Sequence, residues 1–218
     1  MKNTPRPLVF DLDGTLIDSR GDIAAACNHA LVCVGQEPLA VEAIAAHVGS
    51  GARSLLQGVL GEAVQQVDVE VLFREFQSYY VKNPTTHNTL MRGALQCLAL
   101  RENRQIALCT NKPAHLTRAV LGSLGWLESF DFVAAPSPGD RVKPEPDLLR
   151  RVAQALGVVE KDLVMIGDSP QDILAGKAIG AFTVGVKGGF LPLESLIAAG
   201  PDLLLESLDD LADHLEHL

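Results

Sequence analysis

Aromatic residues are scarce in this chain of 218 residues and make up only 5% of it. Hydrophobic residues as a whole nevertheless make up 47%. The apolar residues are therefore mainly Ala, Val, Leu and Ile, as expected where helices cover a parallel sheet. A chain of this length and composition can form one large domain, or one domain that carries a smaller one.

Cysteine is also rare, and long apolar runs are absent. The four cysteines, Cys27, Cys33, Cys97 and Cys109, form no CxxC pair, so we expect free thiols in a reducing compartment and not structural disulfides. The first residues lack an apolar signal core, and no apolar run approaches the roughly 20 residues of a membrane span. We therefore expect a cytoplasmic protein with no membrane partner.

The chain has no surplus of positive charge. Its 18 Lys and Arg residues stand against 27 Asp and Glu residues, which gives a net charge of −9. This balance does not favour nucleic acid or an anionic membrane as a partner. An anionic small-molecule substrate would need a local positive centre within this negative chain.

The spacing of apolar residues divides the chain into a helical segment and a segment of alternating strands and helices. From about residue 18 to residue 86 the spacing is helical, with one stripe from Ile23 to Val34, another from Val69 to Tyr80, and shorter pieces at 41–47 and 52–60. From about residue 88 short strands alternate with amphipathic helices. The expected strands are 7–10, 106–109, 132–135, 163–166, 182–186 and 203–205; the expected helices are 93–101, 114–124, 147–156, 170–179, 193–199 and 208–218.

This alternation predicts an α/β fold, a Rossmann-like parallel sheet with helices on both faces. The opening strand is separated from the others by the helical segment. We therefore predict an α/β core formed by residues 1–17 and 88–218, with a four-helix module of residues 18–87 inserted after the first strand.

Polar residues follow four of the predicted strands at the points where the strands end. Asp11 and Asp13 follow the first, Thr110 and Asn111 the second, a loop that ends in Lys143 the third, and Asp168 the fourth, with Asp172 a few residues later. In open α/β sheets ligands bind beyond the carboxyl ends of the strands. Single strands often end in such residues as turn and cap formers, but four together predict a site.

The negative charge expected at this edge of the sheet requires a compensating cation. Four carboxylates and one lysine would meet there, and two like charges 4 Å apart repel by roughly 4 kcal/mol at an effective dielectric of 20. A cluster without compensation would shift its pKa values or resist folding. Oxygen ligands without Cys or His favour Mg²⁺ over Zn²⁺, so we predict a magnesium site.

The same set of motifs resembles the haloacid dehalogenase-like hydrolase superfamily. The matching stretches are 11–15 (Asp-Leu-Asp-Gly-Thr), Thr110-Asn111, Lys143-Pro144 and 167–172 (Gly-Asp-Ser-Pro-Gln-Asp), and their order and spacing match over essentially the whole chain. Within the superfamily, the insertion directly after the first motif is similar to the cap of the phosphoglycolate phosphatase branch. Two departures from that branch are Arg92 before Gly93, where the branch commonly has proline, and Ser50 between two glycines, where it often has asparagine.

The resemblance implies a role for each core residue. Asp11 would be the nucleophile that forms an aspartyl-phosphate, and Asp13 the general acid and then the base. Lys143 would neutralise charge on the phosphate and on Asp11. The implied metal ligands are Asp11, Asp13 (through its main-chain carbonyl), Asp168 and Asp172. Asp172 would act directly, through water or by orienting Lys143. The implied phosphate-binding groups are the hydroxyl of Thr110 and the main-chain amide of Asn111.

Two residues of the cap are candidate contacts to the substrate. Ser50 lies in the Gly49-Ser50-Gly51 loop, which could lie over the substrate, and Arg53 could pair with a substrate carboxylate. The alternative for Arg53 is a solvent-facing residue beside a turn between helices.

The resulting expectation is a Mg²⁺-dependent phosphatase for a small phosphorylated metabolite, with 2-phosphoglycolate as the first candidate, working as a monomer or homodimer. One alternative is a sugar phosphomutase, which shares the cap position and the pair of aspartates. A second is a non-catalytic phospho-acceptor module similar to a response-regulator receiver, although the insertion after the first strand and the position of Asp13 argue against it.

Overall fold

The computed structural model describes residues 5–216, and within them six strands form one parallel sheet. The strand order is β5-β4-β1-β6-β7-β8. The strands are β1 (Leu8–Phe10), β4 (Ile106–Cys109), β5 (Phe132–Ala134), β6 (Val164–Gly167), β7 (Phe182–Val186) and β8 (Leu203–Leu205). Each predicted strand agrees with the observed one to within a residue at either end, and the α/β fold class is confirmed.

The order of the strands places β1 at the centre of the sheet and at its switch point. After β1 the chain builds β4 and β5 on one side, and then returns to the other side of β1 to build β6, β7 and β8. Ligands bind at such a reversal, beyond the carboxyl ends of the strands. The edge that follows β1, β4 and β6 is therefore the favoured position for a site.

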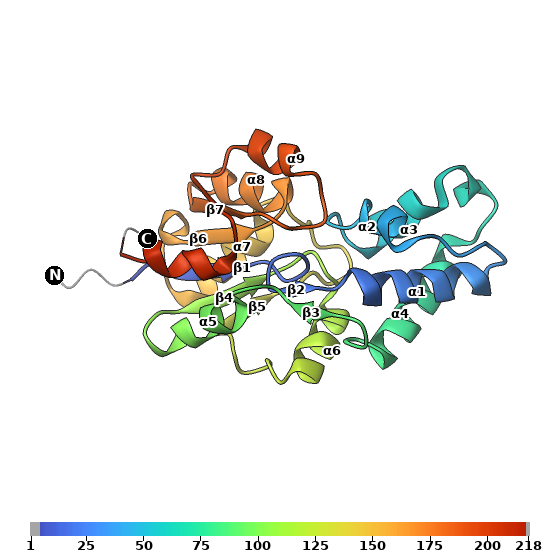
Figure 1. Ribbon diagram of the computed structural model, residues 1–218, viewed down its shortest axis with the longest axis horizontal. Coiled ribbons are helices and arrows are strands. Elements are labelled where there is room, and N and C mark those ends of the chain that lie inside the picture. The colour runs from blue at the N-terminus through green and yellow to red at the C-terminus, as the bar shows by residue number, and fades with distance from the viewer. Residues whose placement is uncertain (1–4, 217–218) are drawn as a thin grey trace.

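Helices cover both faces of this sheet, and the buried strand residues alternate between two apolar clusters (Figure 1). Leu8 and Phe10 belong to one cluster and Val9 to the other, as the alternation of a strand requires. The first face is covered by α5 (Ala94–Ala99), α6 (Ala114–Leu124) and the 3-10 helix η4 (Leu208–His214); the second by α7 (Asp147–Leu156) and α8 (Pro170–Ala178), with α9 (Leu193–Ala199) packed beside α8.

Between β1 and α5 the described chain forms four α helices that make a separate lobe, on the right in Figure 1. They are α1 (Arg20–Cys33), α2 (Val41–Ala45), α3 (Ala52–Leu60) and α4 (Val69–Lys82), with a 3-10 helix η1 (Gly61–Gln65) before α4. Helix α1 packs along α4, and their apolar stripes bury Ile23, Leu72 and Phe76. The division into domains of residues 1–17 with 88–218 and of residues 18–87 stays a prediction, and its outer ends lie outside the described residues.

Two short strands that were not predicted connect the lobe to the core. β2 (Ile17–Asp18) leaves the core, β3 (Thr89–Leu90) returns to it, and the two pair antiparallel. Beside them, Asp22 of α1 accepts a hydrogen bond of 2.7 Å from the backbone N–H of His87. Strands of two residues show no periodicity, so the sequence pattern could not indicate them.

Two predicted helices differ from the structure. The predicted α helix at 208–218 is instead the 3-10 helix η4 (Leu208–His214), and residues 217–218 lie outside the described part. A 3-10 helix has three residues per turn, and Leu208 and Leu211 thereby share a buried face. The predicted helix at 93–101 ends as an α helix at Ala99 and continues as the 3-10 helix η2 (Leu100–Glu102).

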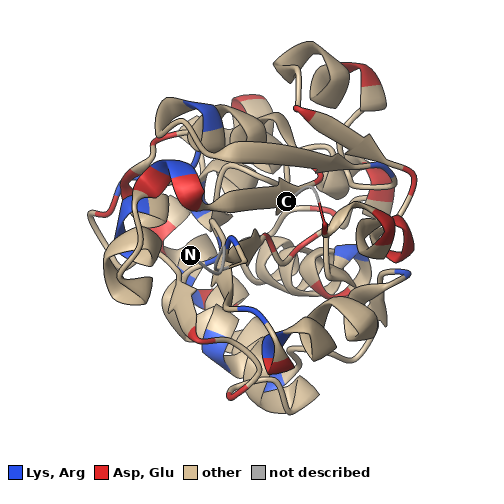
Figure 2. Ribbon diagram, turned by 90° about the vertical axis from the view of Figure 1, so that its left-hand side faces the viewer, with Lys and Arg blue, Asp and Glu red and all other residues tan. Residues whose placement is uncertain are grey.

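The remaining expectations concern thiols, membranes and charge. All four cysteines are free, and Cys33 is the exposed one. Among the described residues, no helix combines the length and the apolar character that crossing a membrane requires. Figure 2 shows acidic and basic residues interspersed over the ribbon.

Candidate active site

One pocket beyond the carboxyl ends of β1, β4 and β6 brings most of the predicted core residues together. It lies where the core meets the helical lobe. The predicted residues among those that line it are Asp11, Asp13, Thr110, Asn111, Lys143 and Asp168. Asp172 lies directly behind them, in contact with Lys143.

Lys143 is the positive centre of this pocket. Its ammonium donates to Asp11 Oδ1 (2.9 Å), to Asp172 Oδ1 (2.5 Å) and to the carbonyl oxygen of Cys109 (2.6 Å). Burial alone would lower the pKa of Lys143, but the charges of Asp11 and Asp172 outweigh it and hold the pKa above its usual value. An ammonium has three N–H donors, so these partners saturate Lys143.

Asp172 is held by the first turn of α8, and both of its oxygens have partners. Oδ1 accepts from Lys143, while Oδ2 accepts from the backbone N–H and the hydroxyl of Ser169 at 3.1 and 2.6 Å. A Cβ atom on Gly167 would lie 2.2 Å from Asp172 Cγ, so this approach requires glycine. Of the three roles open to Asp172, the contacts favour orienting Lys143 over direct metal binding.

Asp168 lies in a cradle of small residues. Its Oδ1 accepts a hydrogen bond from the Thr15 hydroxyl at 2.7 Å. A Cβ atom on Gly14 or on Gly189 would lie 2.4 or 2.0 Å from Asp168 Oδ2, and Gly14 has φ of +91°. The backbone therefore closes around this carboxylate on two sides.

The three carboxylates of Asp11, Asp168 and Asp172 are buried, with oxygens within 4.8 Å of one another. Burial raises the pKa of Asp11 to about 6, with Lys143 opposing and Asp172 adding to the rise. Burial, followed by the charges of Asp172 and Asp11, raises the pKa of Asp168 well above its usual value. The lysine alone thus leaves the cluster short of positive charge, as expected of a site that holds a cation.

The donor atoms fit a magnesium ion. The second carboxylate oxygens of Asp11 and Asp168, and the main-chain carbonyl oxygen of Asp13, accept no hydrogen bond from any residue that the structure describes. All three are hard oxygen donors of the kind that Mg²⁺ prefers. These are the residues that could hold the ion.

Unpaired donors complete the pocket. The backbone N–H groups of Leu12, Asp13 and Asn111 donate to no residue in the described range. The Thr110 hydroxyl accepts a 3.2 Å bond from the backbone N–H of Lys112, and its own hydrogen stays available. Unpaired donors of this kind suit an anion, because buried polar groups require a partner.

The structure adds a residue that the sequence prediction missed, Lys112. Its ammonium lies 2.9 and 3.0 Å from the two oxygens of Asp13, and Asp13 Oδ1 also accepts a 2.6 Å bond from the hydroxyl of Ser19. Lys112 directly follows Thr110 and Asn111, so its place in the strand-end motif was the available signal.

A second missed feature is the side chain of Asn111, which joins the two lobes. Its amide nitrogen donates to Gly49 in the helical lobe and to the carbonyl oxygen of Lys143, both at 2.8 Å. Its amide oxygen accepts from the backbone N–H of Lys143, also at 2.8 Å. The loop that carries Lys143 is thereby fixed to the pocket.

Comparison with known proteins agrees with this geometry. A family model described as haloacid dehalogenase-like hydrolase matches residues 7–180. The chain belongs to this hydrolase family. A curated phosphoglycolate phosphatase of Neisseria meningitidis is 34% identical over 96% of this chain and 93% of its own length, and one of Cereibacter sphaeroides is 36% identical over 97% and 98%.

A solved structure from Haemophilus somnus, described as a predicted phosphoglycolate phosphatase, superposes on the hydrolase with a TM-score of 0.89. It is 25% identical and covers 98% of this chain and 99% of its own. CbbY of Rhodobacter sphaeroides, solved in complex with phosphate, has a TM-score of 0.80 at 23% identity over 95% and 96% of the two chains, a likeness of fold. The expected family is confirmed.

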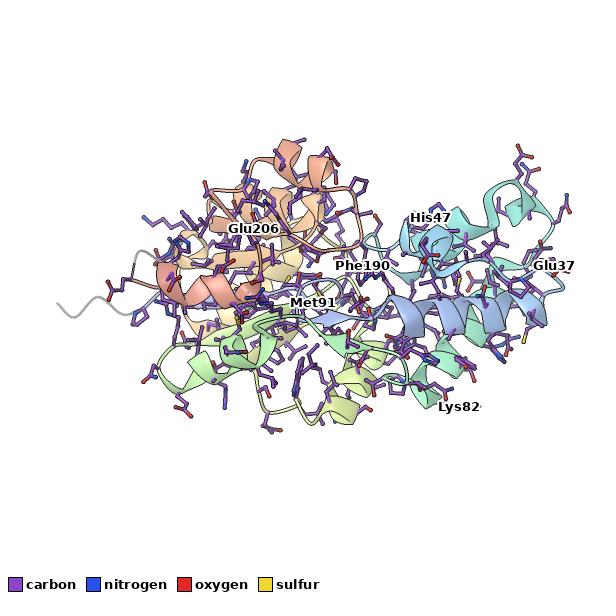
Figure 3. All side chains as sticks on the ribbon, in the orientation of Figure 1. Glu37, His47, Lys82, Met91, Phe190 and Glu206 are labelled. Atoms are coloured by element: carbon purple, nitrogen blue, oxygen red, sulfur yellow. The ribbon has the colours of Figure 1, made fainter. Side chains whose placement is uncertain are left out.

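The helical lobe gives the hydrolase mostly apolar side chains and backbone at this pocket. Ile23, Leu55 and Phe76 form its wall together with Phe190, which follows β7 in the core. Figure 3 places Phe190 where the core meets the lobe. Gly49, Gly51 and Ala52 also line the pocket.

Ser50 and Arg53, the predicted cap contacts, are not among the residues that line this pocket. Ser50 is exposed between two glycines that do line it. Arg53 forms an ion pair with Glu70 and lies 4.3 Å from the centre of the Phe73 ring. These neighbours within the lobe direct its guanidinium away from the expected position.

Proposed function

We propose that the chain is a Mg²⁺-dependent phosphatase that hydrolyses a small phosphomonoester through an aspartyl-phosphate, with 2-phosphoglycolate as the first candidate substrate. The observation that carries the proposal is the buried contact between Lys143 and Asp11, in a pocket that is also lined by Asp168 and by two residues with unpaired backbone N–H groups, Asp13 and Asn111. Family membership and the curated relatives support a phosphatase.

Asp11 is the proposed nucleophile. One of its oxygens attacks phosphorus and the bond from phosphorus to the ester oxygen breaks, which leaves the phosphoryl group on Asp11. Lys143 and the N–H groups of Leu12 and Asn111 would stabilise the charge on the phosphoryl oxygens. Positioning and charge stabilisation of this kind provide most of the catalysis in phosphoryl transfer.

Asp13 is the proposed general acid and base. It gives its proton to the departing ester oxygen, then takes a proton from a water molecule that attacks the phosphoryl group and releases inorganic phosphate. The contacts with Ser19 and Lys112 hold its carboxylate at the pocket. Both partners thus serve to orient the acid.

Magnesium would be held by Asp11, by Asp168 and by the main-chain carbonyl oxygen of Asp13. When bound, it supplies positive charge to the carboxylates and to the phosphoryl oxygens. Asp172 holds Lys143 in place and lies outside this set.

The test is a panel of phosphate esters assayed with Mg²⁺ and with a chelator. We expect continuous release of phosphate that depends on Mg²⁺, with 2-phosphoglycolate among the best substrates by kcat/KM. Conversion of a hexose 1-phosphate into its isomer would instead indicate a mutase. Retention of a single phosphoryl group per chain, without turnover, would indicate a phospho-acceptor module and contradict the proposal.

A further inference from the structure

Among the described residues, two cationic side chains line the pocket, Lys143 and Lys112. They differ in how many of their N–H donors have an acceptor. Lys143 has three acceptors within 2.9 Å. Lys112 contacts a single acceptor residue, Asp13. Because an ammonium has three N–H donors and Asp13 accepts two of them, one donor of Lys112 remains for a ligand or for the nearby Tyr80 hydroxyl, which has no other partner in the described part of the chain.

The surroundings of Lys112 keep this charge buried and fixed. Its side chain is 5% exposed, and its ammonium lies 4.5 Å from the centre of the Tyr80 ring, which belongs to the helical lobe. The lysine is therefore a buried cation that is paired with Asp13 at the point where the two lobes meet.

The position of Lys112 relative to Asp13 indicates which part of a substrate it would meet. Asp13 is the proposed acid for the ester oxygen, so the group attached to that oxygen enters the space beside Asp13 and Lys112. Apolar side chains form much of the wall of the same pocket, among them Ile23, Phe76 and Leu116. A single spare cation within apolar walls selects an anion on a short chain.

We propose that Lys112 binds a second anionic group of the substrate, a carboxylate on the leaving group one carbon beyond the ester oxygen. Lys112 is then a specificity-determining residue shared between this carboxylate and Asp13. The inference rests on the proposed function, because it needs the phosphoryl group at Asp11. It assigns the recognition of the leaving group to the core motif, at a position next to Asn111, and not to Arg53 of the helical lobe.

The first experiment compares 2-phosphoglycolate with ethyl phosphate, which has a methyl group where 2-phosphoglycolate has a carboxylate. In the Lys112→Met variant we expect the ratio of their kcat/KM values to fall by about 10- to 100-fold, the range for a charge-assisted hydrogen bond. Most of the loss should lie in the KM for 2-phosphoglycolate. Lys112→Arg keeps the charge and should restore part of the ratio.

Two control variants separate the effect of losing the Lys112 charge from a general disturbance of the structure. Tyr80→Phe removes a buried hydroxyl beside Lys112 but keeps the ring, and should preserve the ratio. Lys161→Met removes an exposed lysine in the 3-10 helix η3 (Glu160–Asp162), before β6 at the opposite end of the sheet, and should change neither substrate. If Lys112→Met lowers kcat/KM for both substrates equally, Lys112 only orients Asp13 and the subsite is wrong.

The second experiment measures binding without turnover, by calorimetry with 3-phosphonopropionate and with propylphosphonate. The wild-type chain should bind the carboxylate analogue more tightly, and Lys112→Met should remove that preference. Equal binding of the two analogues by the wild-type chain would overturn the subsite even if phosphatase activity is found. A preference that depends on Lys112, in a chain that releases no phosphate from any ester, would support the subsite and contradict the proposed phosphatase activity.

Discussion

The core and the helical lobe face each other across one pocket, but they contribute different kinds of chemical group to it. On the core side, Lys143, Asp172 and Asn111 are tied to one another by buried hydrogen bonds. On the lobe side, the pocket meets apolar side chains and the backbone of Gly49 and Gly51. The difference shows that the charged side chains of the pocket come from the core, while the lobe contributes apolar wall and backbone.

The largest expected effect concerns the core. Replacing Asp11 by Asn keeps the shape of the side chain but removes the nucleophile, so kcat should fall on the order of 10⁴- to 10⁶-fold. The measurement is release of phosphate from an aryl phosphate under saturating substrate. Asp213→Asn, at an exposed position of η4, is the matched control and should retain full activity. An Asp11→Asn variant with intact activity would remove the basis for the proposed mechanism.

A smaller effect is expected at the bond that joins the two regions. Asn111→Ala leaves the backbone N–H and carbonyl of Lys143 without partners and frees Gly49 of the lobe. We expect unfolding to become easier by about 1–3 kcal/mol, and kcat/KM to fall by up to about 100-fold because Lys143 is less well placed.

Thermal unfolding and steady-state kinetics measure these two effects of Asn111→Ala. Asn103→Ala, at an exposed position, is the control and should change neither. If Asn111→Ala lowers stability but leaves kcat/KM intact, the side chain holds the fold without placing the lysine.

The dependence of stability on Mg²⁺ and on pH tests the charge of the buried carboxylates on the core side. The pKa of Asp11 is higher in the folded chain, at about 6, than in an unfolded chain. The folded state therefore holds this proton more tightly, and the metal-free protein should lose stability as the pH rises from about 4 to about 6. Mg²⁺ binds the ionised carboxylates, so its stabilising effect should increase with pH over the same range and beyond it.

Thermal unfolding with Mg²⁺ and with a chelator, at matched ionic strength, measures this effect. A concentration near 100 times the dissociation constant should stabilise by about 2.7 kcal/mol, which corresponds to a rise in Tm of about 5–11 °C for a chain of this size. The rise should be largest near pH 8 and small near pH 5. The same rise at both pH values would contradict a site built from Asp11 and Asp168.

The sequence predicted the core side better than the lobe side, for physical reasons. Asp11 and Asp168 follow strands, and parallel strands place their carboxyl ends at one edge of the sheet, so topology alone brought them together. The contact between Lys112 and Asp13 depends on which way a side chain points after the strand ends. That direction is set by Ser19 and Tyr80 from the helical lobe, which no local pattern encodes.

The fold shows the same contrast between strong and weak patterns. Helices 114–124, 147–156 and 193–199 were predicted to the residue because their apolar spacing is sustained and Gly directly follows each of them as the C-cap. The end of the chain was predicted as an α helix because its leucines fit both a spacing of three and a spacing of four. Packing of Leu208 and Leu211 against the core selected the tighter helix.

The smallest expected effect concerns Arg53 on the helical lobe, and it tests whether Arg53 or Lys112 recognises the leaving group. Both were candidates to meet a substrate carboxylate, but Arg53 is exposed and paired with Glu70 of the same lobe. Exposed ion pairs contribute little to stability, so Arg53→Met should change Tm only slightly. Its ratio of kcat/KM values for 2-phosphoglycolate and ethyl phosphate should stay within about 2-fold of the wild-type ratio, since a side chain outside the pocket makes no bond to the leaving group. A large fall in this ratio for Arg53→Met, with Lys112→Met unaffected, would reassign the recognition of the leaving group from the core to the lobe.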